Sequence, residues 1–316
     1  MGTTGIFFMN TRLQETTFMQ SDQAGWWDYY ELGKPRIVML IVFTAIVGML
    51  LAVPGMVPLR QFIFGTIGIG LAASCASAIN HLLDRRADAA MFRTRHRPLP
   101  QGHVTERQVI IYALMLGVSS MLVLLVFVNW LTAALTFASL IGYAIIYTGF
   151  LKRASPQNIV IGGIAGAAPP VLGWAAVTNH VDAGALLLCL IIFVWTPPHF
   201  WALAIHRRED YAKAGIPMLP VTHGVSYTVL HIIFYTILLV AVSLLPYIIG
   251  MSGLLYLIGA LILGGIFLAY AFAMRFNSDP SLPMRTFRYS IVYLTAIFIL
   301  LLADHYVPLL MQSLSG

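Results

Sequence analysis

Three oxygen-bearing side chains in one helical stretch are the sharpest chemical signal in the chain. Asn80, Asp84 and Asp88 are spaced four residues apart. Four residues make about one helical turn, so the three side chains share one helix face, about 6 Å apart along the axis. Carboxylate and amide oxygens are hard ligands suited to Mg²⁺, which binds in proteins through one or two carboxylates together with substrate phosphate. The spacing therefore favours a magnesium site that receives a phosphorylated substrate.

Basic residues crowd the segment that follows this stripe. Breaking an allylic carbon–oxygen bond builds negative charge on a leaving diphosphate, and Mg²⁺ with fixed guanidinium or ammonium groups stabilises that charge. The candidates for this second role are Arg95, Arg97, Lys152 and Arg153. Two alternatives stay open: the aspartates pair only with adjacent arginines at a wet helix end, and each basic residue serves as a topology anchor.

The rest of the chain is too apolar for a water-soluble domain. Residues AVILMFWYC make up 59% of the 316, and charged residues only 9%. A membrane-spanning helix needs about 20 apolar residues. We expect such helices near 37–53, 62–83, 108–128, 130–150, 158–177, 183–204, 226–249, 252–274 and 286–303. The sequence thus predicts an all-α integral membrane protein of about nine transmembrane helices. The stripe begins inside one of them, where polar side chains are costly and mark function.

The basic residues also predict the topology. The predicted helices place 17 of the 18 Lys and Arg residues on one side of the membrane. Only Arg60 falls in a loop on the opposite side. The positive-inside rule then places the amino terminus and the long loops in the cytoplasm, and the carboxyl terminus across the cell inner membrane. We expect residues 1–27 to form a cytoplasmic extension, without a cleavable signal peptide, before one domain over 28–316. Cys75 and Cys189 fall inside predicted helices and are interpreted as packing residues.

Several longer motifs resemble the UbiA superfamily of membrane prenyltransferases, and within it the haem O synthase (protohaem IX farnesyltransferase) branch. The resemblance covers about residues 28–304. Its motifs are Lys34-Pro35-Arg36, the stripe continued through Arg93-Thr94 to Arg97-Pro98-Leu99-Pro100, Tyr147 with Lys152-Arg153, and the glycine-rich 158–174. The branch-specific stretch is Trp195-Thr-Pro-Pro-His199-Phe200-Trp201, followed by Asp210-Tyr211 and Gly215-Ile216-Pro217.

The resemblance implies a nine-helix bundle with a cytoplasm-side active-site cavity. It implies farnesyl diphosphate held on Mg²⁺ by Asn80, Asp84 and Asp88, with Lys152 aiding catalysis and Arg36 and Tyr147 contacting substrate. Haem B would be the acceptor and haem O the product, with water adding to the haem-side cation. Haem A synthase or a terminal oxidase assembly would be a protein partner.

One motif departs from the superfamily pattern. Many relatives carry a second DxxxD after the sixth helix, whereas here His206 stands four residues before Asp210 and Ala214 four after. The number of metal ions is therefore left open. We expect Asp210 to belong to the second cluster, where it orients a basic side chain.

The position of the haem is less constrained by the sequence. His199 and His206 are seven residues apart and share a helix face if the helix survives Pro198, so either could contact iron or a propionate. Arg207 and Arg208 could pair with propionates. The alternative for each histidine is a hydrogen bond to backbone at a helix end.

Two other functions are alternatives to this one. A related prenyltransferase that acts on an aromatic acid or a quinone precursor would keep the first motif, but 195–220 argues against it. A haem-binding or transport protein would carry charged residues along several helices, whereas here the charged residues cluster at one rim.

Overall fold

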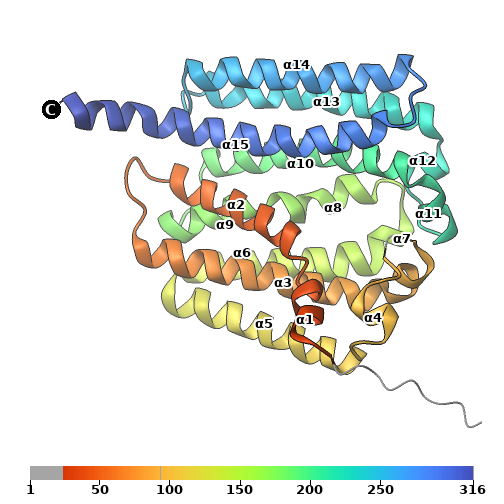
Figure 1. The fold of residues 1–316 in the computed structure, drawn as a ribbon. Coiled ribbons are helices and arrows are strands. Elements are labelled where there is room, and N and C mark those ends of the chain that lie inside the picture. Colours follow the sequence, from red (N-terminus) through yellow and green to blue (C-terminus); the bar gives the residue numbers. More distant parts are fainter. Residues whose placement is uncertain (1–23, 93, 316) are drawn as a thin grey trace, which may run out of the picture.

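The protein is a bundle of long helices with short helices gathered at one end (Figure 1). The computed structural model describes residues 24–92 and 94–315, and the side chains of Arg153 and 308–315 are not described. Most of the expected extension 1–27, together with Arg93 of the first motif, lies outside this description. The boundary after residue 27 falls inside the first helix, α1 (Trp26–Leu32).

Eight helical segments in the described residues are long and apolar enough to cross a membrane, and a bent pair makes up to nine. The bent pair is α1 with α2 (Pro35–Leu51), which meet at 51°. The other spans are α3 (Leu59–Ala90), α5 (Glu106–Phe127), α6 (Trp130–Ile141) with the π-helix η1 (Gly142–Leu151), α8 (Asn158–Ala167) with α9 (Pro169–Thr178), α10 (Ala183–His206), α13 (Val225–Ile248), α14 (Leu254–Phe276) and α15 (Leu282–Ser315). The prediction of an all-α membrane protein with about nine spans is confirmed.

Short helices cap the end of the bundle that carries most of the basic residues. They are α4 (Pro98–Gln101), α7 (Lys152–Ala154), α11 (Arg208–Lys213) and α12 (Leu219–Thr222), and all lie at the right of Figure 1. Arg60 lies at the start of α3, and the carboxyl terminus ends α15, both at the other end. The separation of basic residues expected from the sequence is thus present in the fold.

Close packing between helices is made possible by small residues. α3 packs along α5, α2 along α9, and α10 between α13 and α15. At Gly173 of α9 a Cβ atom would lie 1.9 Å from the carbonyl oxygen of Ala45 in α2, so only glycine fits there. Large apolar side chains such as Leu114 and Val118 of α5 stay exposed, as expected for a surface that faces lipid.

Candidate active site

The predicted stripe is buried near the basic end of α3. Asn80, Asp84 and Asp88 are each at most 5% exposed. α3 extends to Ala90, well past the apolar stretch that ends near residue 83, so one helix carries all three side chains. Buried charges of this kind require partners.

Lys152 supplies a partner for Asp84. Its Nζ donates to Oδ2 of Asp84 at 2.5 Å, and Nδ2 of Asn80 donates to the same oxygen at 2.9 Å. Asn80 also donates to Oγ1 of Thr148 at 3.3 Å. Asn158 donates to the carbonyl of Lys152 at 3.2 Å and fixes the turn that presents the lysine.

Arg97 supplies the partner for Asp88. Its guanidinium donates to Oδ2 of Asp88 at 2.6 Å. Arg97 is also the residue that caps the start of α4. Thr94 donates through its hydroxyl to the carbonyl of Asp88 at 3.0 Å, which holds the segment after α3 against the helix. Two of the basic residues predicted to bind substrate, Lys152 and Arg97, therefore lie beside the acidic stripe.

Lys34 also belongs to this cluster, although only Arg36 of the Lys34-Pro35-Arg36 motif is predicted from the sequence as a site residue. Its Nζ donates to Oδ1 of Asn80, and its charged neighbours are Asp84, Asp88, Arg97 and Lys152. Lys34 has a left-handed backbone, with φ at 48°, in the break between α1 and α2. Proline at the next position was the available signal, because it fixes the start of a helix and isolates the residue before it.

A π-helix forms another wall of the site. η1 carries Tyr143, Tyr147 and Thr148, and Asp84 is among the charged neighbours of both tyrosines. A Cβ atom at Gly162 would lie 2.1 Å from the Tyr147 ring, so the glycine allows that ring to pack on α8. π-Helices are rare and often mark functional sites. The predicted site residue Tyr147 therefore lies near the stripe.

The charges of this cluster favour an anion. Lys34, Lys152 and Arg97 bring three basic side chains against the two carboxylates of Asp84 and Asp88. These groups lie in a region shielded from water, where electrostatic attraction is stronger than at the surface. An anionic group that entered the cluster could draw the basic side chains away from the carboxylates.

The same residues fit a magnesium ion. In the described part of the chain no group of three or more His, Cys, Asp or Glu side chains could hold a metal on its own. Mg²⁺ does not require such a group, because it commonly binds one or two carboxylates and completes its octahedron with water and phosphate oxygens. Two aspartates and the amide oxygen of Asn80 match this chemistry.

Other predicted residues lie at the surface of this end. Arg36, Arg95, His206 and Arg208 are exposed, and the Arg95 guanidinium lies 4.5 Å from the centre of the Phe92 ring. Their roles in binding substrate stay predictions. The side chain of Arg153 is outside the description.

The second cluster is predicted in the segment after α10. Asp210 lies 3.8 Å from the guanidinium of Arg207, so the aspartate does pair with a basic side chain. Whether this pair contacts the diphosphate or the haem is still a prediction.

His199 is held firmly within the bundle. α10 continues without a break through Pro197 and Pro198, so both histidines lie on one helix. Their surroundings differ, because His199 is buried and His206 is exposed. The ring of His199 stacks against Trp195 at 4.2 Å and Phe287 at 4.5 Å, and Nδ1 hydrogen-bonds Ser290 Oγ at 2.6 Å. These contacts give the ring a packing role, and a haem contact stays a prediction.

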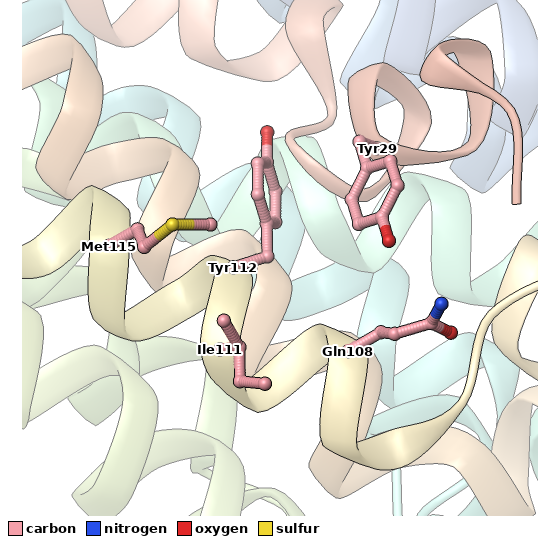
Figure 2. A pocket seen from close by; sticks show the side chains of 5 residues that line it. All are labelled: Tyr29, Gln108, Ile111, Tyr112 and Met115. Carbon is pink, nitrogen blue, oxygen red and sulfur yellow. The ribbon is translucent and has the colours of Figure 1, made fainter.

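A separate cavity of about 260 Å³ opens between α1 and α5 (Figure 2). Its lining consists of Tyr29, Gln108, Ile111, Tyr112 and Met115. Figure 2 shows Tyr29 of α1 facing Tyr112 of α5, and their ring centres are 5.3 Å apart. None of the stripe residues lines this cavity, so it is distinct from the candidate active site.

Comparison with known sequences places the chain in a family. The model of the UbiA prenyltransferase family matches residues 41–302. A protein from Methylococcus capsulatus named protoheme IX farnesyltransferase is 61% identical over 93% of this chain and 100% of its own length. A protein of the same name from Thioalkalivibrio sulfidiphilus is 58% identical over 95% of this chain and 99% of its own length.

Solved structures share the fold. One, described as giving structural and mechanistic insights into digeranylgeranylglyceryl phosphate synthase in membranes, matches with a TM-score of 0.74 at 17% identity, over 88% of this chain and 98% of that one. A UbiA homologue from Archaeoglobus fulgidus bound to GPP and Mg²⁺ matches with a TM-score of 0.57 at 17% identity, over 87% of this chain and 99% of that one. The family match and the curated relatives extend over nearly the whole bundle, and the chain belongs to the UbiA prenyltransferase family.

Proposed function

We propose that this membrane enzyme transfers the farnesyl group of farnesyl diphosphate to a vinyl group of haem B, giving haem O and diphosphate. The observation that supports a diphosphate donor is the convergence of Lys34, Lys152 and Arg97 on the buried stripe of Asn80, Asp84 and Asp88. The relatives named protoheme IX farnesyltransferase, 57–61% identical to this chain, support the choice of acceptor.

Asp84 and Asp88, assisted by Asn80, would hold Mg²⁺ on the diphosphate. When bound, the ion supplies positive charge that neutralises the leaving group. Lys34, Lys152 and Arg97 then turn from the carboxylates to the phosphate oxygens and stabilise the charge that develops as the carbon–oxygen bond breaks. Once bound to the phosphate oxygens, these side chains are held in place before the bond breaks, so little further reorganisation is required.

The residues around the cluster protect the farnesyl cation. The apolar bundle shields the cation from bulk water, and the faces of Tyr143 and Tyr147 carry partial negative charge that attracts a cation. The vinyl group of the haem attacks the terminal carbon of the farnesyl cation, and a positive charge remains on the carbon attached to the porphyrin. Water adds to this carbon and gives the hydroxyl group of haem O.

The basic end of the bundle is proposed to face the cytoplasm of a cell inner membrane, with the carboxyl terminus on the other side. Support comes from the gathering of the described Lys and Arg residues, Arg60 apart, at this end of the fold. The division into an extension over 1–27 and a prenyltransferase domain over 28–316 is likewise proposed.

A direct assay tests the function. Purified protein in detergent is incubated with farnesyl diphosphate, Mg²⁺ and haem B, and the haem is analysed by mass spectrometry. We expect the mass to increase by one farnesyl group and one hydroxyl group. A parallel reaction offers 4-hydroxybenzoate as the acceptor. Prenylation of that acid with unchanged haem would overturn the proposal.

A further inference from the structure

Two buried polar side chains on α3 lack hydrogen-bond partners in the described part of the protein. His81 is 1% exposed and neither ring nitrogen makes a hydrogen bond, and Ser77, 6% exposed, makes none through Oγ. Buried polar groups are nearly always hydrogen-bonded, because a buried group without a partner has lost its hydrogen bonds to water and gained none in return. Two such groups on adjacent turns of one helix therefore call for a common partner.

Both side chains face the same side of α3 as the metal-binding stripe. At 3.6 residues per turn, Asn80, Asp84 and Asp88 cover an arc of about 80°. Ser77 falls inside this arc, and His81 lies about 20° beyond the Asp88 edge. Ser77 precedes Asp84 by seven residues and so lies about 10 Å further along the helix, toward the middle of the membrane. Ser77 thus extends the polar face inward by about one turn, and His81 lies beside the stripe at the level of Asn80.

The surroundings connect the pair to the cation cluster. Lys34 and Arg97 are the charged neighbours of His81. The ring therefore lies at the inner edge of the cluster, between the proposed diphosphate position and the apolar middle of the bundle. A small molecule that can both donate and accept hydrogen bonds would satisfy His81 and Ser77 at once, and water has this property.

We infer that His81 and Ser77 hold the water molecule that the reaction consumes. This inference rests on the proposed function, in which a carbon–carbon bond to the vinyl group leaves a cation beside the porphyrin. A lone pair of the held water forms the new carbon–oxygen bond. The proton of the resulting oxonium passes to the diphosphate released in the first step, and no oxidant or reductant is needed.

The two side chains then decide which product forms. Without a positioned water, the same cation loses a proton from the neighbouring carbon and becomes an alkene, lighter than haem O by one water. Holding the water close to the cation favours addition over this elimination. His81 and Ser77 are thus positioning residues that act through the water and do not touch the diphosphate.

The product ratio tests the inference. His81→Leu keeps the approximate volume of the side chain but removes both nitrogens, and His81→Gln restores a donor and an acceptor. In His81→Leu we expect the ratio of hydroxylated to dehydrated product to fall by about tenfold, as for the loss of one hydrogen bond in a buried site. In His81→Gln we expect most of the ratio to return. Mass spectrometry of the haem gives both products in one run.

A matched control is Thr132→Val. Thr132 of α6 is fully buried and its hydroxyl also lacks a partner among the described residues, but it lies near Asn129 at the other end of the bundle. This variant should give the wild-type ratio. If His81→Leu does not fold, Ser77→Ala is measured in its place with the same criterion.

The outcomes separate this inference from the proposed function. Wild-type protein that leaves haem B unchanged would refute the function itself. Wild-type protein that makes haem O, together with an unchanged product ratio in the folded variant, would refute the role of His81 and Ser77 alone.

Discussion

Lys152 and Asp84 form an ion pair between two elements far apart in the sequence, with Nζ and Oδ2 at 2.5 Å. The lysine follows the π-helix and the aspartate lies on α3, so the pair forms only when η1 packs on α3. The side chain of Asp84 is 2% exposed and that of Lys152 16%. Breaking the pair should therefore affect both the stability of the fold around the site and the catalytic activity.

Lys152→Met should lower both activity and stability. Removing one partner of a buried ion pair typically costs about 3–5 kcal/mol, because the other charge stays buried. We expect a lower unfolding temperature in detergent and at least about a hundredfold loss of farnesyl transfer. The double variant Lys152→Met with Asp84→Asn should recover much of the unfolding temperature and none of the activity. Recovery of activity in the double variant would contradict the assignment of Asp84.

Lys34→Met should reduce the rate of transfer. Lys34 reaches the stripe from the break before α2 and places its amine next to both aspartates. Loss of one such group typically costs about 10²–10³-fold in kcat, since it acts on charge that develops during bond breaking. Release of diphosphate measured at saturating farnesyl diphosphate gives kcat directly.

Lys213→Met is the control for this variant. Lys213 is an exposed lysine of α11 at the same end of the bundle, so it tests the effect of overall charge. Equal losses in the two variants would show that general attraction of the anionic substrate, and not the position of Lys34, accounts for the effect.

The residues of the site that could be predicted are those whose geometry is local. Asn80, Asp84 and Asp88 share a face because helical periodicity is the same in every α-helix. The length of the apolar runs predicted the spans, although α3 continues to Ala90, beyond the apolar stretch, because its polar stripe is satisfied inside the protein. Lys152 and Arg97 are predicted as basic residues that could stabilise a leaving diphosphate, and tertiary packing brings both beside the stripe.

The residues that could not be predicted depend on packing between distant segments. Lys34 turns inward because of a left-handed residue and a 51° bend between α1 and α2, neither of which has a periodic signature. The π-helix that carries Tyr147 has no sequence signal that separates it from an α-helix. His81 was visible in the first motif, but its significance lies in burial without a partner, which only the folded chain reveals.

Removal of magnesium should stop the reaction reversibly. Asp84 and Asp88 offer two carboxylates, and a carboxylate pair with substrate phosphate is the usual protein site for this ion. Added chelator should abolish diphosphate release, and excess Mg²⁺ should restore it. In Asp88→Asn the Mg²⁺ concentration for half-maximal activity should increase by about tenfold or more, since one charged ligand is lost. Undiminished turnover in chelator would exclude the metal site.

Gly173→Ala should destabilise the bundle without touching the site. A Cβ atom there would lie 1.9 Å from the carbonyl oxygen of Ala45, so α9 and α2 would have to move apart. Overpacking of this kind typically costs about 1–3 kcal/mol or more, and thermal unfolding in detergent should show a lower midpoint. The matched control is Gly166→Ala in α8, where a Cβ atom would meet nothing within 4 Å. Because alanine reduces the freedom of the unfolded chain, this control should be neutral or slightly stabilising, and an equal loss in both variants would contradict the close approach of α2 and α9.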